Sequence, residues 1–107
     1  MKYLTSILFT LLSFNCYSAT HVYDTKIKKV FVHETDNNGT IYFIFEDMQN
    51  GDDCLKSGNI AATNDNVMFD KILSIGLAAL MSKSNVGYTI NGCSSSGHPR
   101  LTNLWVE

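Results

Sequence analysis

The first nineteen residues place the tightest limit on what this chain can fold into. Lys2 is followed by an almost unbroken apolar run over residues 3–14, and small or polar residues come next, up to Ala19. A charged start, a short apolar stretch and small residues at a cleavage point are typical of a secretory signal peptide. The apolar run is shorter than the roughly 20 residues that a membrane-spanning helix needs. The sequence therefore predicts a signal peptide over residues 1–19.

Cleavage after Ser18 or Ala19 leaves residues 20–107 as one small exported α+β domain. These are 88 of the 107 residues, near the lower end of what folds alone. We expect a periplasmic or secreted protein with no stable membrane insertion after cleavage. Cys16 leaves with the signal peptide, because the residues before it do not resemble a lipoprotein site.

The two remaining cysteines, Cys54 and Cys93, form an even pair in an oxidising compartment, which predicts a disulfide. Metal binding is the competing interpretation, but two isolated cysteines lack the close pairs that build zinc sites. In the chain-entropy model, closing a loop of roughly 40 residues stabilises the fold by about 4 kcal/mol. The disulfide is therefore expected to matter to so small a domain.

The charge of the mature chain is slightly acidic, with seven lysine or arginine residues against ten aspartate or glutamate residues. Nucleic-acid binding usually needs a basic patch. Lys26, Lys28 and Lys29 form the one cluster of basic residues, and we interpret it as the solvated side of a strand. The sequence therefore predicts no nucleic-acid partner.

The first half of the mature chain predicts a hairpin. Residues 26–34 and 40–46 are rich in β-branched and aromatic side chains, and Asn38-Gly39 between them is a strong turn signal. Alternation places Ile41, Phe43 and Phe45 on the core face. Tyr42 and Ile44 make the opposite face unusually apolar, so we expect another element or another subunit to cover that face.

The second half predicts one helix and three further strands. Periodic apolar residues after Asn64-Asp65-Asn66 predict a helix over 67–82, in which Gly76 indicates close packing. The other predicted elements are a polar turn at 47–53, a short strand over 54–62, a strand over 86–90, a turn at Asn91-Gly92, a loop over 94–100 that holds Pro99, and a strand over 101–106. The element order is therefore β-β-β-α-β-β. It predicts an α+β fold with five antiparallel strands, either a curled sheet or a partly closed barrel of the oligonucleotide/oligosaccharide-binding type.

This order resembles that of the binding subunits of bacterial AB-type toxins. The shared traits are the signal peptide, Cys54 ahead of a long helix, the strand Val86-Gly87-Tyr88-Thr89-Ile90 and Cys93. The resemblance covers nearly the whole mature chain as architecture and carries over no sugar-contacting residue. It implies an exported, disulfide-bonded homo-oligomer, commonly a pentamer, in which helices line a pore and strands pair between neighbours.

Catalysis is not predicted. Ser94, Ser95, Ser96 and His98 are close in sequence, but a hydrolase needs a nucleophile, a base and an orienting group in a defined geometry. These residues lie in a loop with no obvious orienting carboxylate. An enzyme would require His98 beside an activated serine and a carboxylate.

No metal or cofactor is predicted either. His21, His33 and His98 are scattered along the chain, and the acidic segment 47–53 fails the ligand spacing of a calcium loop. We interpret the histidines as unliganded and the acidic segment as a solvated turn.

Binding is the predicted function. Tyr42, Tyr88 and Trp105 are the aromatic residues that could stack on a sugar or a protein, although core packing is the simpler interpretation of all three. The first hypothesis is a non-catalytic exported module that binds a glycan or receptor, as an oligomer. The alternative is a small periplasmic interaction protein, either an inhibitor or an accessory factor, whose partner the sequence does not identify.

Overall fold

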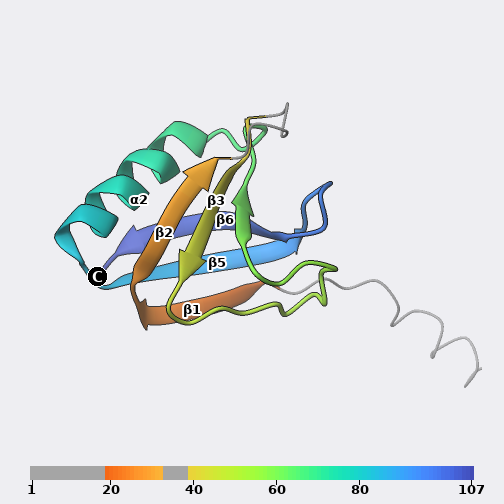
Figure 1. Cartoon of the computed structure of the whole chain (residues 1–107), viewed down its shortest axis with the longest axis horizontal. Helices are drawn as coiled ribbons and strands as arrows, with labels where there is room; N and C mark the ends of the chain where they lie inside the picture. The colour runs from red at the N-terminus through yellow and green to blue at the C-terminus, as the bar shows by residue number, and fades with distance from the viewer. Residues whose placement is uncertain (1–18, 33–38) are drawn as a thin grey trace, which may run out of the picture.

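The structure, a computed structural model, describes residues 19–32 and 39–107. Residues 1–18 of the predicted signal peptide, His33 and the turn residues before Gly39 lie outside this part. Figure 1 shows a curled sheet with one helix packed against it. In chain order the elements are β1 (Thr20–Thr25), β2 (Ile27–Val32), β3 (Ile41–Phe45), β4 (Ile60–Ala62), α2 (Phe69–Ser82), β5 (Val86–Cys93) and β6 (Pro99–Val106).

The six strands form one mixed, open sheet in the order β1-β5-β6-β4-β3-β2. Neighbouring strands are antiparallel except β4 and β6, which run parallel and pair Ala61 with Arg100. β1 and β2 follow each other in the chain yet form opposite edges of the sheet. The chain turns sharply between them in Figure 1, next to Asp24, whose φ is 55°. The predicted α+β class is confirmed.

The predicted five-stranded, antiparallel, partly closed barrel is wrong in three respects. Strand β1 was missed because only Val22 and Thr25 of its six residues are buried, which leaves a weak apolar pattern. β4 and β6 are parallel because α2 and β5 form the crossover that parallel strands need. The sheet stays open because its two edge strands, β1 and β2, do not pair with each other. The Asp47 N–H, in the loop after β3, donates to Thr25 Oγ1 at 3.0 Å.

The core lies on the face of β3 that the alternation predicted. Ile41, Phe43 and Phe45 are all buried, and the Phe45 ring stacks on Tyr88 with centroids 4.0 Å apart. The opposite face of β3 is covered from within the same chain. Tyr42 is only 3 % exposed, because the Phe31 and His98 rings pack against it with centroids 5.4 and 4.9 Å away.

Helix α2 begins two residues later than predicted. The Asn66 side chain accepts the Met68 N–H at 2.9 Å, and its carbonyl accepts the Phe69 N–H at 3.0 Å. These bonds form a turn before the helix and leave Met68 without a capping side chain. The helix ends at Lys83, whose φ of 56° is left-handed. Within residues 19–32 and 39–107, no helix is long and apolar enough to cross a membrane.

Three other predicted boundaries differ from the structure. The predicted turn at Asn91-Gly92 is a bulge inside β5, where Gly92 has a φ of 71°. Pro99 is not in a loop but begins β6, a position that tolerates its missing N–H. The third strand is limited to the three residues of β4, because the chain before it follows an irregular path.

Gly76 explains how closely α2 approaches the sheet. A Cβ atom at this position would lie 2.5 Å from Phe43 Cε1 and 3.6 Å from Leu104 Cδ2. Two non-bonded carbon atoms cannot lie 2.5 Å apart, so the helix can pack this closely on the sheet only because residue 76 has no side chain. The prediction of close packing at Gly76 is confirmed.

Gly76→Ala should therefore lower the free energy of unfolding. Overpacking of a well-filled core costs about 1–3 kcal/mol, whereas alanine in place of glycine in a helix returns only about 1 kcal/mol. We expect a net loss of roughly 1–2 kcal/mol in urea denaturation. Gly58→Ala is the matched control, because a Cβ there meets no atom within 4 Å. An equal or higher stability of Gly76→Ala would contradict the close contact.

Tyr88 is a core residue whose hydroxyl group bonds to the loop after β3. Its ring is fully buried, and its hydroxyl donates to the Asp47 carbonyl at 2.6 Å. Burial disfavours the phenolate and raises the pKa of Tyr88 to about 12. The hydroxyl thus bonds the core to the loop in its protonated form.

Stability should accordingly fall as the pH rises from about 10 to 12. The unfolded chain loses the Tyr88 proton near pH 10, whereas the folded chain keeps it up to about pH 12. The stabilising contribution of protonated Tyr88 is therefore complete below pH 10 and is lost as the pH rises from about 10 to about 12. In urea denaturation at alkaline pH, Tyr88→Phe should flatten this dependence. Tyr23→Phe is the control, since Tyr23 is 65 % exposed; equal alkaline slopes for the two variants would contradict the assignment.

Candidate functional site

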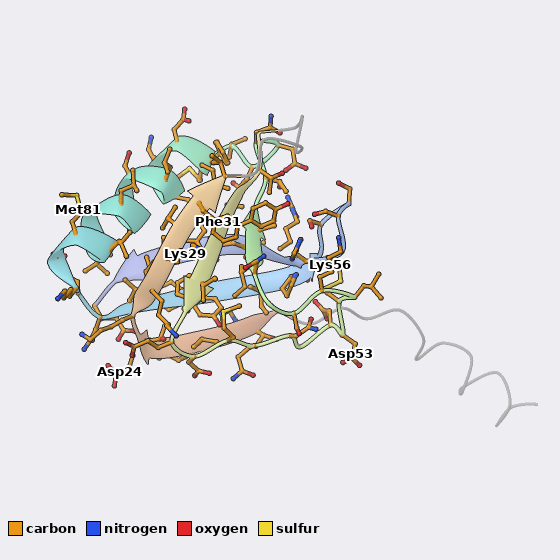
Figure 2. All side chains as sticks on the ribbon, in the orientation of Figure 1. Asp24, Lys29, Phe31, Asp53, Lys56 and Met81 are labelled. Atoms are coloured by element: carbon orange, nitrogen blue, oxygen red, sulfur yellow. A yellow bond between two sulfur atoms is a disulfide. The ribbon has the colours of Figure 1, made fainter. Side chains whose placement is uncertain are left out.

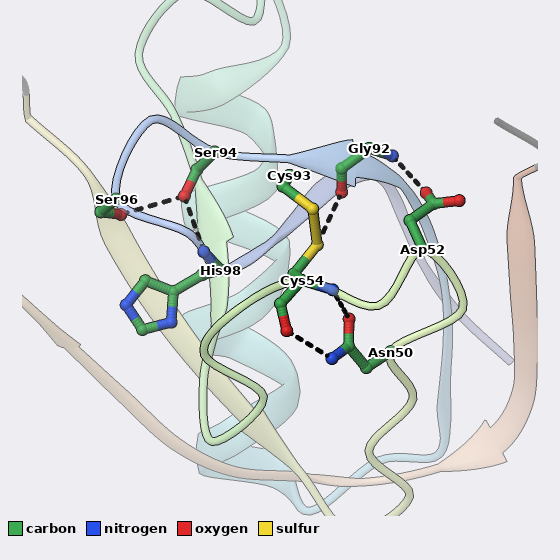
Figure 3. The surroundings of a disulfide bond; sticks show 8 residues. All are labelled: Asn50, Asp52, Cys54, Gly92, Cys93, Ser94, Ser96 and His98. Atoms are coloured by element: carbon green, nitrogen blue, oxygen red, sulfur yellow. Dashed lines mark hydrogen bonds between the residues drawn. A yellow bond between two sulfur atoms is a disulfide. The ribbon is translucent and has the colours of Figure 1, made fainter. Parts of the chain in front are cut away.

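The Cys54–Cys93 disulfide joins the loop before β4 to the end of β5. The two sulfur atoms are 2.01 Å apart, and Figure 3 shows the polar contacts around them. The Asn50 side chain accepts the Cys54 N–H at 2.8 Å and donates to the Cys54 carbonyl at 2.9 Å. Asp52 accepts the Gly92 N–H at 2.6 Å. The loop is therefore held to β5 by both covalent and hydrogen bonds.

The predicted serine cluster forms a closed turn next to this disulfide. The Ser94 N–H donates to the His98 carbonyl at 2.7 Å, and the Gly97 N–H donates to the Ser94 carbonyl at 2.9 Å. The Ser94 hydroxyl lies 3.0 Å from that of Ser96 and accepts the backbone N–H of His98 at 3.2 Å. In Figure 3 the His98 ring points away from Ser94. The turn brings Ser94 to the His98 backbone rather than to its imidazole, so no nucleophile–base pair is built there.

A polar pocket of about 450 Å³ opens on one side of this turn. We call it the polar pocket, and its lining residues are Thr40, Thr63, Asn64, Asp65, Cys93, Ser94, Ser95 and Arg100. They come from the start of β3, the segment after β4, the end of β5, the serine turn and the start of β6. The disulfide lies at its wall through Cys93. The site thus depends on segments that are far apart in the sequence.

Two opposite charges lie side by side in the polar pocket. Arg100 forms an ion pair with Asp65 at 3.7 Å, and its Nε donates to Thr63 Oγ1 at 3.5 Å. The Thr63 hydroxyl also donates to the Asp65 carboxylate. This hydrogen bond, followed by the charge of Arg100, lowers the pKa of Asp65 below its usual value. The pocket therefore presents a carboxylate acceptor and a guanidinium donor at neutral pH.

Sequence reasoning missed most of the polar pocket. Ser94 and Ser95 were singled out, but Asn64 and Asp65 were interpreted only as helix-capping residues. Arg100, the one arginine in the chain, was interpreted as part of a loop. The presence of a single arginine in the whole chain was the signal that could have identified Arg100 as a site residue.

The histidines and the acidic segment do not come together. His21 Nδ1 is 2.8 Å from Thr89 Oγ1, and the His98 ring packs against Tyr42. In the part of the chain that the structure describes, which excludes His33, no three His, Cys, Asp or Glu residues form a cluster that could hold a metal ion. Asp47 and Asp52 instead bond the loop to Tyr88 and Gly92.

Of the three predicted stacking residues, Tyr42 and Tyr88 are in the interior and Trp105 is at the surface. The Trp105 ring lies across Gly87, where a Cβ atom would be only 2.3 Å from its Cε2 atom. It thereby reaches Tyr23 on β1, with ring centroids 5.7 Å apart, and its Nε1 donates to Glu107 at 3.3 Å. This Tyr23–Trp105 pair lies on the outer face of the sheet. Tyr23 was missed because β1 was missed.

Comparison of the chain with models of known protein families and with curated proteins found no match. Function is therefore inferred from the chemistry of the polar pocket and of the Tyr23–Trp105 pair.

Loss of the disulfide should destabilise the fold. Replacing both Cys54 and Cys93 with alanine frees a chain segment with a sequence separation of 39, and loss of such a bond typically costs about 2–5 kcal/mol. Urea denaturation under oxidising conditions measures the loss. As a control, dithiothreitol should weaken the parent protein by a similar amount and leave the double variant unchanged. Equal stabilities of parent and variant would show that the bond contributes nothing.

Proposed function

We propose that this chain is a non-catalytic exported binding module whose polar pocket takes a hydroxyl-rich ligand such as a glycan. The observation that carries the proposal is the lining of the polar pocket. Of the eight lining residues, all seven apart from the disulfide cysteine carry a side-chain hydroxyl, amide, carboxylate or guanidinium. Such a surface favours binding of a ligand that makes many hydrogen bonds over binding of an apolar ligand.

The chemistry of these groups matches that of sugar hydroxyls, each of which both donates and accepts hydrogen bonds. Asp65 is an acceptor, Arg100 is a donor, and the Thr40, Ser94 and Ser95 hydroxyls can do either. The charges of Asp65 and Arg100 balance each other. This balance favours a neutral, polyhydroxylated ligand over an ionic one.

Export is part of the proposal. The predicted signal peptide directs the chain to the periplasm or beyond, where disulfides persist. The Cys54–Cys93 bond fits that compartment, and it also holds one wall of the polar pocket. The ligand would therefore be met outside the cytoplasm.

Assembly into a homo-oligomer is also proposed, in keeping with the resemblance to toxin binding subunits. Its support is exposed apolar surface on two elements. Leu77 and Met81 of α2 are 42 % and 84 % exposed, and Val32 at the end of β2 is exposed as well. Exposed apolar residues of this kind often mark contacts between chains.

The second candidate function is that of a periplasmic interaction protein, and the Tyr23–Trp105 pair favours it. Trp105 also borders a hollow of about 220 Å³ between α2 and β6, whose other apolar walls include Ile75 and Leu104. Aromatic residues beside an apolar hollow are typical of protein interfaces. In this case Tyr23→Ser, and not a change in the polar pocket, should abolish binding of the partner.

A glycan array with the purified protein tests the first proposal. Asp65→Asn should weaken binding of the best ligand about ten- to a hundred-fold, because hydrogen bonds to charged groups contribute about 1.5–3 kcal/mol. Asp53→Asn is the matched control, since Asp53 is exposed and lies outside the polar pocket. Light scattering of the same sample reports the number of chains per particle; a ring of several copies is expected, and a monomer would contradict the oligomer. The absence of any glycan ligand, or an Asp65→Asn variant that binds like the control, would contradict the glycan proposal.

A further inference from the structure

A third recess, unlike the polar pocket in its chemistry, lies where β2 begins and α2 ends. It has a volume of about 350 Å³. We call it the lysine hollow, and its lining residues are Lys26, Ile27, Lys28, Glu46, Leu80 and Lys83. Three of the seven basic residues of the mature chain thus surround one recess, with a single carboxylate among them.

The three lysines of the lysine hollow form no ion pair within the part of the chain that the structure describes. Over residues 19–32 and 39–107 the only ion pair joins Arg100 to Asp65, so neither Lys28 nor Lys83 has an acidic partner. Glu46 lines the hollow but lies beyond ion-pair distance of these ammonium groups. Like charges held together repel each other, and an anion between them relieves that repulsion. The site therefore favours a negatively charged group.

One ammonium group is already held in place. Lys26 Nζ donates to the Lys83 carbonyl at 3.0 Å and to Asn85 Oδ1 at 2.7 Å. The Lys26 carbonyl accepts the Glu46 N–H at 2.9 Å, which fixes the backbone of two walls. A preorganised charge loses little conformational freedom when a ligand binds. Lys28 and Lys83 are exposed and can close on the ligand from outside.

The remaining walls are apolar. Ile27 is 7 % exposed and belongs to the core, and Leu80 is half-buried against it. Leu77 is 42 % exposed and, three residues before Leu80, lies on the same face of α2. A purely ionic ligand would leave this apolar surface in water, whereas an alkyl chain would cover it.

We propose that the lysine hollow binds an amphiphile with one anionic head group, a phosphate or carboxylate, and a short alkyl chain. The head group lies among Lys26, Lys28 and Lys83, and the chain follows Leu80 toward Leu77. This site does not rest on the proposed glycan function, because it shares no lining residue with the polar pocket. The amphiphile is either a free molecule or a lipid within an anionic bilayer, and the chemistry that recognises it is the same.

Isothermal titration of the purified protein with octyl phosphate tests the proposal. Inorganic phosphate supplies the head group alone, and octyl glucoside supplies the chain with a neutral head. Octyl phosphate should bind more tightly than either of these two ligands. Its affinity should exceed that of inorganic phosphate by about four-fold for each methylene group that is removed from water. Raising the salt concentration should weaken binding, because the lysines are exposed to solvent. Absence of binding, or equal binding of octyl glucoside, would overturn the proposal.

Charge-removing variants locate the site. Lys28→Gln and Lys83→Gln should each weaken octyl phosphate binding about five-fold, since one lysine near an anionic surface contributes about 1 kcal/mol. Lys56→Gln is the matched control; Lys56 is exposed and lies on the opposite side of the molecule from Met81 in Figure 2. Each single variant keeps the core intact, and thermal melts verify this. Affinities equal to that of the control would overturn the assignment.

Sedimentation with vesicles identifies the source of the amphiphile. Vesicles of phosphatidylcholine with phosphatidylglycerol are compared with vesicles of phosphatidylcholine alone. Sedimentation with the anionic vesicles only, lost in Lys28→Gln and Lys83→Gln, identifies a bilayer lipid. Binding of octyl phosphate without sedimentation identifies a free amphiphile. Equal sedimentation with both kinds of vesicle would overturn the role of the lysines.

Discussion

The covalent link between Cys54 and Cys93 holds together the part of the fold that no regular element organises. Residues 46–59 form an irregular loop that carries the chain from β3 to β4. The disulfide, the Asp52 bond to Gly92 and the Tyr88 bond to Asp47 fasten this loop to β5 at three points. They also place Cys93 and Ser94 at the wall of the polar pocket.

Two glycines set how closely neighbouring elements of the fold pack. The missing side chain of Gly76 lets α2 pack closely on Phe43 of β3. The missing side chain of Gly87 lets Trp105 lie flat across β5 and meet Tyr23. In both cases an aromatic ring occupies the space that a Cβ atom would take. The surface features thus follow from packing within the fold.

The polar pocket and the lysine hollow lie at opposite ends of the same helix and differ in their chemistry. The polar pocket includes Asp65, ahead of α2, and the lysine hollow includes Lys83, at its end. A helix of 14 residues separates them by about 20 Å. The first recess has balanced charge and many hydroxyl groups, whereas the second has unbalanced positive charge and apolar walls. A glycan and an anionic amphiphile could therefore bind at the same time without competing.

Local pattern in the sequence determined the elements with strong periodicity. The alternation of Ile41, Phe43 and Phe45 and the helical spacing of residues 69–82 were readable because a buried face repeats at the period of its own backbone. The pairing of Cys54 with Cys93 followed from counting the cysteines that remain after the signal peptide. Strand β1 escaped detection because burial of two residues in six makes no clear alternation. Only the tertiary structure decided the sheet order, the parallel pairing of β4 with β6, and which residues line the polar pocket and the lysine hollow. Arg100 forms an ion pair with Asp65, and Lys26 donates a hydrogen bond to the Lys83 carbonyl. No local sequence pattern encodes these contacts, because side chains from separate segments become neighbours only when the core brings their strands together.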